Sequence, residues 1–229
     1  MSVKAQRSKA PAPRRTQQAR REATIGKLLD AAADVLIENG YASATVQKIC
    51  ARAGVSQGGL FRHFPTLEAL MVAVGEHVGR QLLEAYRSDF ERLRDREEPI
   101  ALAIALVRKH CRSRPNQAWY ELSVAARTNA VLRKALVPMT IRYYESIEQL
   151  ARETLPDLAA TLGPAFPVVV DTIVSIFDGE VVHRFVLENP PLEDARLEFL
   201  GMLLRQILPV FEAARASRES AAAPKLEKP

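Results

Sequence analysis

Apolar residues recur at intervals of three and four along most of the chain, which is the spacing of amphipathic helices. The first periodic run covers about 25–36 and stops at Asn39-Gly40, a common helix end. Later runs predict helices after Thr45, over about 56–64 and 66–94, from Pro99, around Trp119, and over about 130–154, 166–187 and 192–216.

No pattern typical of a β-sheet accompanies these runs. Val168, Val169 and Val170 are β-branched, but no two short apolar runs are joined by an Asn-Gly or Asp-Gly turn. Leu155-Pro156 and Gly163-Pro164 bracket a predicted loop. The sequence therefore predicts an all-α fold of about nine helices with no internal repeat.

Charge is unevenly distributed along the chain. Residues 1–66 contain 11 Lys and Arg against 4 Asp and Glu, whereas residues 67–229 contain 21 against 23. A basic unit that binds a polyanion and a basic tail that only improves solubility both fit this asymmetry. We expect a disordered basic arm over 1–16 and a flexible tail over 217–229.

The remaining composition favours a soluble, cytoplasmic protein with no membrane partner. No apolar run reaches the roughly 18–20 residues that span a bilayer, and the chain is polar and basic from Met1 to Arg21. Cys50 and Cys111 are the only cysteines, which provides no disulfide framework and suits a reducing compartment.

The most informative segment reads TVQKICARAGVSQGGLFRHFPTLEAL. Thr45 and Ser56 can each cap a short helix, and Gly54 stands where the chain must turn through a left-handed conformation. Leu60, Phe61 and Phe64 can then anchor the second helix. Two short helices joined by a tight glycine turn form a helix-turn-helix.

This segment, with the helix before it, resembles the TetR family of bacterial transcriptional regulators. The matching residues are Ile25, 28–33, Gly40-Tyr41, Thr45-Val46, Ile49, 53–56, 60–65 and 68–70. The resemblance implies a three-helix DNA-binding domain over about 17–65 and a ligand-binding and dimerisation domain over about 66–216.

By this resemblance, the second helix of the motif lies in the major groove of palindromic operator DNA. Gln57 is the expected base reader, because a glutamine amide can pair bidentately with adenine. The expected DNA-binding residues are Thr45, Gln47, Lys48, Ser56, Gln57, Gly58, Gly59, Phe61, Arg62 and His63. Gly58 and Gly59 disfavour a helix, which suggests either close backbone approach to DNA or a helix that orders on DNA.

Two positions depart from the family pattern. Phe61 stands where tyrosine is common and Leu67 where lysine is common, so two phosphate contacts are absent. We expect the basic arm, counted as far as Arg20 and Arg21, to compensate by entering the adjacent minor groove.

For the body, the resemblance implies a homodimer through helices at about 164–188 and 192–216, and an unknown small-molecule effector. Pro138 is expected to bend its helix beside an effector pocket. The expected contacts are His110, Trp119, Met139, Arg142, Tyr143 and Phe177. The same aromatic side chains would also suit an ordinary core, and the apolar stripes would also suit one thicker monomer.

Other classes of function fit less well. The four histidines form no metal-ligating pair and no catalytic motif occurs, so we expect no catalytic residue, metal or cofactor. Two alternatives to a ligand-responsive repressor stay open. One is a thiol-based redox regulator, in which Lys109 and Arg112 lower the pKa of Cys111. The other is a sequence-nonspecific architectural DNA binder.

Overall fold

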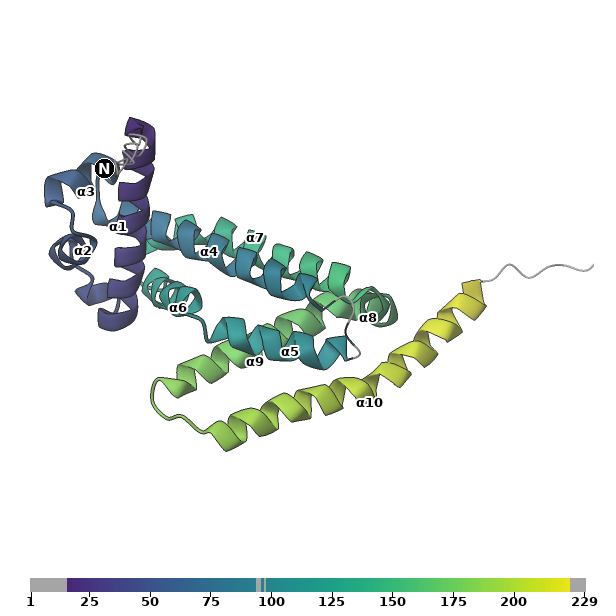
Figure 1. Ribbon diagram of the computed structural model, residues 1–229. Coiled ribbons are helices and arrows are strands. Elements are labelled where there is room, and N and C mark those ends of the chain that lie inside the picture. The colour runs from purple at the N-terminus through teal and green to yellow at the C-terminus, as the bar shows by residue number, and fades with distance from the viewer. Residues whose placement is uncertain (1–15, 94–95, 97, 223–229) are drawn as a thin grey trace, which may run out of the picture.

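The computed structural model describes residues 16–93, 96 and 98–222, and within this part the chain forms helices and no strand (Figure 1). The N-terminal helices are α1 (Gln17–Asn39), α2 (Val46–Ala53), α3 (Gln57–His63) and α4 (Leu67–Glu91). The body contains α5 (Pro99–Cys111), α6 (Arg114–Ala126), α7 (Ala130–Thr154), α8 (Pro156–Leu162), α9 (Phe166–Arg184) and α10 (Pro190–Ala222). The all-α prediction is confirmed. Most of the predicted arm lies outside the described residues.

Short polar side chains fix where several helices begin. The N-cap residues accept hydrogen bonds from backbone N–H groups that have no partner inside the helix. Thr16 accepts from Ala19 at 3.2 Å and Thr66 from Ala69 at 3.0 Å. Asn129 accepts from Leu132 at 3.0 Å, so α7 begins where the sequence predicted.

One short helix, α8, lies where the sequence predicted a loop. Pro156 opens α8 and Gly163, with φ of 54°, ends it. The loop prediction was wrong because a proline in the first turn of a helix removes no internal hydrogen bond. Leu162 is buried with Phe166, which gives α8 a packed face.

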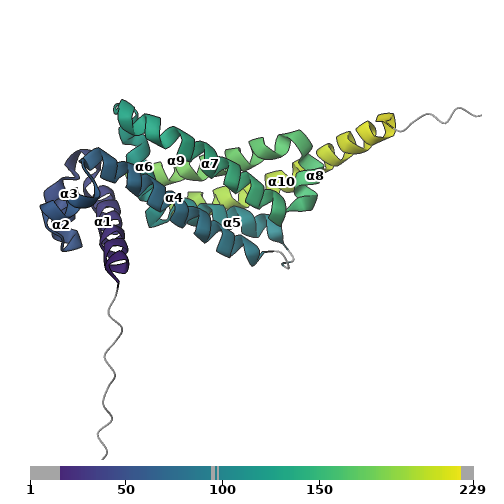
Figure 2. The same cartoon turned by 90° about the horizontal axis from the view of Figure 1, so that it is seen from above.

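The two larger hydrophobic clusters hold most of the molecule together, and α4 belongs to both. The first half of α4 joins α1, α2 and α3 to the neighbouring ends of α6 and α7. The second half joins α5, α7, α9 and α10. Figures 1 and 2 show the result: the small N-terminal domain sits at one end of an elongated helical body, and α10 projects beyond the other end.

The segment Pro156–Arg184 is long and apolar enough to cross a membrane by length and composition. This differs from the expectation that no stretch would qualify. In the structure, however, Gly163 separates it into two helices, and α9 buries Val174 and Phe177 in the second cluster. Burial in the core therefore accounts for part of its apolar character, while Val168 and Val182 of α9 stay exposed.

Buried charges join α5, α9 and α10. Glu180, which is only 3% exposed, accepts hydrogen bonds from Arg108 at 3.1 Å, Arg112 at 2.5 Å and Arg196 at 2.5 Å. Glu193 accepts a hydrogen bond from Arg112 at 2.8 Å and another from Arg184. Burial alone would raise the pKa of Glu180, but the hydrogen bonds from the arginines outweigh it and hold that pKa below its usual value.

Replacing Glu180 with glutamine should destabilise the fold by about 3–5 kcal/mol near pH 7, because buried arginines lose their shared counter-charge. The lowered pKa makes Glu180 stabilising above the unfolded-state pKa of about 4.5, and this contribution disappears as the pH falls through the folded-state pKa. Urea unfolding at several pH values tests both points: the parent should lose more stability than Glu180→Gln on acidification.

The matched control is Glu148→Gln, which removes a half-exposed ion pair with Arg152 inside α7. We expect a loss of at most about 0.5 kcal/mol there. Equal losses for the two variants would show that the buried network contributes no more than a surface pair.

Candidate functional site

The turn between α2 and α3 fixes the geometry of the N-terminal domain. Gly54 ends α2 with φ of 65° and ψ of 34°, a left-handed conformation that glycine adopts at little cost. Thr45 caps α2 by accepting from Lys48 at 3.3 Å, and Ser56 caps α3 by accepting from Gly59 at 3.1 Å. Capping on both sides of a left-handed glycine produces the predicted helix-turn-helix.

Helix α3 is fastened on one side and open on the other. Leu60 is fully buried and Phe64, directly after the helix, is 9% exposed. On the opposite side Gln57, Gly58 and Phe61 are exposed, so the expectation that Phe61 anchors the helix was wrong. Within the described residues no hydrogen bond engages the Gln57 side chain, so its amide is available to a partner outside the chain.

Most of the predicted DNA-binding residues are exposed. The exposed members are Thr45, Gln47, Lys48, Ser56, Gln57, Gly58, Phe61 and Arg62, whereas Gly59 and His63 are half-buried. The Lys48 ammonium donates to the Asn39 side chain at 2.6 Å, which holds it near the start of α2. Contact of each residue with DNA stays a prediction.

The two glycines of α3 have different surroundings. A Cβ atom on Gly59 would lie 2.9 Å from Val55 Cγ1 and 3.2 Å from Ser56 Oγ, so the tight turn itself requires a glycine there. A Cβ atom on Gly58 would meet nothing within 4 Å. Packing within the chain therefore explains why residue 59 is a glycine. It does not explain why residue 58 is one.

A basic groove lies beside α3. Its walls come from the start of α1 and the end of α3: Gln17, Gln18, Arg20, Arg21, Thr24, Arg62 and His63. Arg20 and Arg21, assigned from the sequence to the arm, instead belong to α1. This change matters because a helix holds these guanidinium groups next to Arg62, on a fixed surface that suits a phosphate backbone.

A second groove, of about 260 Å³, opens between α4, α6 and α7. It brings together four of the six residues predicted to contact an effector: Trp119, Met139, Arg142 and Tyr143. The α4 wall, which was not predicted from the sequence, consists of Gly75, Glu76, Gly79, Arg80 and Leu83. The sequence did contain a signal for this wall, namely two glycines four residues apart in a predicted helix. Each glycine destabilises a helix relative to alanine, so their presence suggests that the space a side chain would take is needed there.

His110 and Phe177 do not line this groove. Phe177 is fully buried in the second cluster. The His110 ring lies 4.2 Å from that of Tyr86, and its Nε2 is 3.1 Å from an Asp89 carboxylate oxygen. Burial outweighs the effect of Asp89 and lowers the pKa of His110, so the ring is neutral near pH 7.

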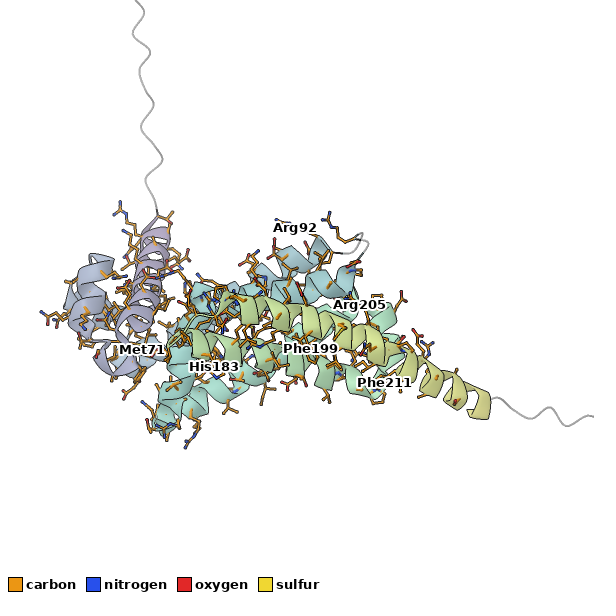
Figure 3. All side chains as sticks on the ribbon, turned by 90° about the horizontal axis from the view of Figure 1, so that it is seen from below. Met71, Arg92, His183, Phe199, Arg205 and Phe211 are labelled. Carbon is orange, nitrogen blue, oxygen red and sulfur yellow. The ribbon has the colours of Figure 1, made fainter. Side chains whose placement is uncertain are left out.

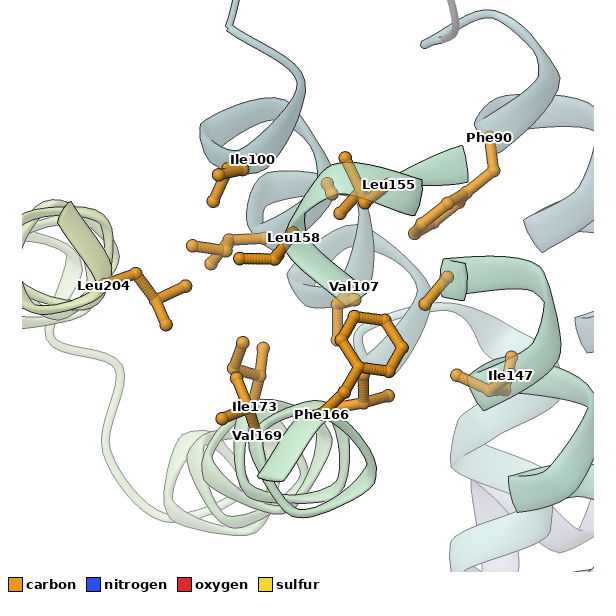
Figure 4. Close-up of a pocket in the computed structure, with 14 residues that line it drawn as sticks. Phe90, Ile100, Val107, Ile147, Leu155, Leu158, Phe166, Val169, Ile173 and Leu204 are labelled. Carbon is orange, nitrogen blue, oxygen red and sulfur yellow. The ribbon is translucent and has the colours of Figure 1, made fainter. Parts of the chain in front are cut away.

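A third cavity lies deeper in the body and is lined entirely by hydrocarbon side chains (Figure 4). Phe90, Val107, Ile147 and Phe166 point into it from four different helices, and Leu204 closes it from α10. Its volume is about 50 Å³. A space this small and without a polar group can hold little more than a small apolar group.

Neither cysteine has the character of a redox sensor. The prediction that Lys109 and Arg112 lower the pKa of Cys111 was wrong: burial, reinforced by the nearby Asp178 carboxylate, raises it strongly. The two cations are engaged elsewhere, Lys109 with Asp89 at 2.6 Å and Arg112 with Glu180. Burial also raises the pKa of Cys50, so both thiols stay protonated and unreactive.

Helices α9 and α10 carry an apolar face that no other part of the described chain covers. On α10, Leu192, Phe199, Leu203 and Val210 follow helical spacing and are 37–68% exposed. On α9, Val168 and Val182 are exposed, and a Cβ atom on Gly179 would meet nothing within 4 Å. In Figure 3, α10 crosses the face of the molecule turned toward the viewer, with Phe199 on it.

Comparison with known proteins supplies the context for these surfaces. Residues 28–74 match the family described as bacterial regulatory proteins, tetR family. An uncharacterized HTH-type transcriptional regulator of Mycobacterium tuberculosis is 38% identical over 190 residues, which cover 83% of this chain and 97% of the relative.

Solved structures share the fold. A transcriptional regulator from Rhodococcus sp. Rha1 superimposes with a TM-score of 0.63 at 22% identity, covering 81% of this chain and 96% of its own. The multidrug binding protein EbrR, complexed with imidazole, gives 0.55 at 21% identity over 80% of this chain and 93% of its own.

The contrast between the two glycines of α3 is testable by stability. Gly59→Ala should destabilise the domain by about 1–3 kcal/mol, because the new methyl group overlaps Val55. Gly58→Ala should stabilise it by about 0.5–1 kcal/mol, because alanine favours a helix and has open space. Thermal unfolding of both variants beside the parent measures the difference, and shifts of the same sign would contradict this account.

Proposed function

The chain belongs to the TetR family and is a DNA-binding transcriptional regulator, and from this premise we propose that it is a cytoplasmic, ligand-responsive repressor. It binds palindromic operator DNA as a homodimer, with α3 of each protomer in the major groove. A small molecule in the body alters its affinity for the operator. We propose no enzymatic role, because the relatives are named as transcriptional regulators.

The observation that carries the DNA-binding mode is the one-sided exposure of α3. Gln57 and Gly58 occupy its first turn and are exposed, while Leu60 fixes the helix to the core. Gln57 reads an adenine edge, and the absence of a side chain at Gly58 lets the backbone approach the groove. Arg20, Arg21 and Arg62 line the adjacent groove and contact phosphates.

The apolar face of α9 and α10 supports a homodimer. Exposed apolar surface of this extent, on two adjacent helices, is typical of a protein interface. A twofold pairing places α9 and α10 against their copies, and the open space above Gly179 allows close approach of the helices. Dimerisation then sets the spacing of the two α3 helices along the operator.

The groove between α4, α6 and α7 supports the effector site. Helix α4 forms one wall and also holds the helix-turn-helix through its first half. An effector that binds one α4 position better than another changes the separation of the two α3 helices. The loss of DNA affinity then equals the difference in effector affinity between the two states. EbrR, with bound imidazole, is a structural neighbour that binds small molecules.

Operator recognition can be tested by selecting genomic fragments bound by the protein and measuring their affinity by fluorescence anisotropy. Gln57→Ala should weaken binding to the selected dyad site by about 1–3 kcal/mol and relax the preference at one base pair of each half-site. Gln149→Ala, which changes an exposed glutamine in the C-terminal half of α7, is the matched control and should bind like the parent.

The same measurement separates a specific regulator from an architectural DNA binder. A specific regulator should prefer its dyad site over random DNA by about 10³-fold or more. Selection that enriches no dyad-symmetric sequence would favour the architectural alternative and contradict the proposed mode.

Dimerisation through α10 is tested by placing a charge on its exposed face. Phe199→Asp should shift the protein toward monomer in sedimentation velocity, because a buried carboxylate without a partner opposes association. Val137→Asp is the control, since Val137 is similarly exposed on α7, outside the proposed interface. A parent protein that sediments as a monomer, or equal behaviour of the two variants, would exclude this interface.

A further inference from the structure

We propose that the effector is an aromatic carboxylate, bound in the groove between α4, α6 and α7. Its ring packs beside Trp119 and Tyr143, and its carboxylate pairs with the guanidinium groups of Arg80 and Arg142. This inference rests on the proposed function, because it names the chemical class of ligand for the same groove.

The aromatic part of the inference comes from the α6 and α7 walls. The rings of Trp119 and Tyr143 are stacked, with centroids 6.4 Å apart and an interplanar angle of 30°. Met139 lines the groove beside them and offers a polarisable thioether that adapts to a ring. A planar apolar surface of this kind favours a flat aromatic ligand over a flexible chain.

The anionic part comes from the charges at the groove. Arg80 on α4 and Arg142 on α7 are both exposed, and within the described residues no ion pair engages either guanidinium group. Glu76 is the one carboxylate that lines the groove, so the lining carries an excess of one positive charge. Guanidinium groups bind carboxylates bidentately, which gives both affinity and orientation.

The space for a ring comes from α4. A Cβ atom on Gly79 would meet nothing within 4 Å, so no packing inside the chain requires a glycine there. A larger side chain at this position would instead enter the groove. One turn earlier α4 packs tightly against α7, since a Cβ atom on Gly75 would lie 2.8 Å from Leu136. The helix is therefore closely packed at Gly75 and open at Gly79.

The apolar cavity of Figure 4 is a poorer site for such a ligand. Its lining has no donor or charge, and at about 50 Å³ it is too small for a ring with a carboxylate. The groove also contacts α4 directly, whereas the cavity touches α4 only through Phe90, near its C-terminal end. Ligand binding in the groove therefore acts on the helix that carries the DNA-binding domain.

Trp119 is the only tryptophan in the chain, so its fluorescence reports on the groove directly. The test titrates the full-length protein with benzoate, benzamide, benzylammonium and octanoate while monitoring that fluorescence. We expect saturable quenching by benzoate, with an affinity at least about tenfold higher than that of benzamide, because charge-assisted hydrogen bonds are lost in the amide. Tighter binding of benzylammonium or octanoate, or no saturable response to benzoate, would overturn the assignment.

Variants locate the site. The double variant Arg80→Gln, Arg142→Gln should lose about tenfold or more in benzoate affinity and little in benzamide affinity. Gly79→Leu should abolish binding of both by filling the groove. Arg87→Gln, which changes an exposed arginine of α4 outside the groove, should leave both affinities unchanged. Circular dichroism confirms that each variant is folded, and an unchanged benzoate affinity in the double variant would exclude the arginines as its partners.

Operator binding measured in parallel distinguishes this inference from the proposed function. If benzoate quenches Trp119 as expected but leaves operator affinity unchanged, the ligand class stands and regulation through this groove fails. If operator affinity responds to benzylammonium or octanoate and not to benzoate, the regulatory function stands and the aromatic carboxylate is excluded.

Discussion

Helix α4 has to complete two hydrophobic cores at once, and most of the structure depends on this. Leu70 and Val74 belong to the cluster that holds the helix-turn-helix, while Tyr86 and Phe90 belong to the cluster of the body. A helix of 25 residues is about 37 Å long and behaves as a stiff rod over that length. The orientation of the DNA-binding domain is therefore determined by packing far from the DNA.

Charged contacts between α1, α2 and α6 reinforce this arrangement. Arg114, at the start of α6, donates to Asp34 of α1 at 2.5 Å, and Arg52 of α2 lies 3.4 Å from the same carboxylate group. Two residues before Arg114, Arg112 joins Glu180 and Glu193. The exposed ion pairs contribute little to the free energy of unfolding, whereas removing one partner of a buried ion pair lowers that free energy substantially. The short connection between α5 and α6 thus touches both the DNA-binding domain and the α9–α10 pair.

The recognisable parts of the fold were those with local causes. Side-chain caps and a left-handed glycine act within a few residues, so the helix-turn-helix and the start of α7 could be predicted from the sequence. The α8 helix was missed because a proline marks a helix start as well as a break. The redox alternative failed for a similar reason: Lys109 and Arg112 adjoin Cys111 in sequence, but in space their charges are directed to Asp89 and Glu180.

Amino-acid order was sufficient for the all-α class, the family and the helix-turn-helix, because helical periodicity and capping are properties of short segments. It could not show which predicted effector residues meet, because Trp119 and Tyr143 lie on different helices and their stacking depends on how these pack. Nor could it show that Gly79 and Arg80 of α4 line the same groove as Trp119 and Tyr143. Those assignments depend on contacts between segments, which exist only once α4 has brought the two cores together.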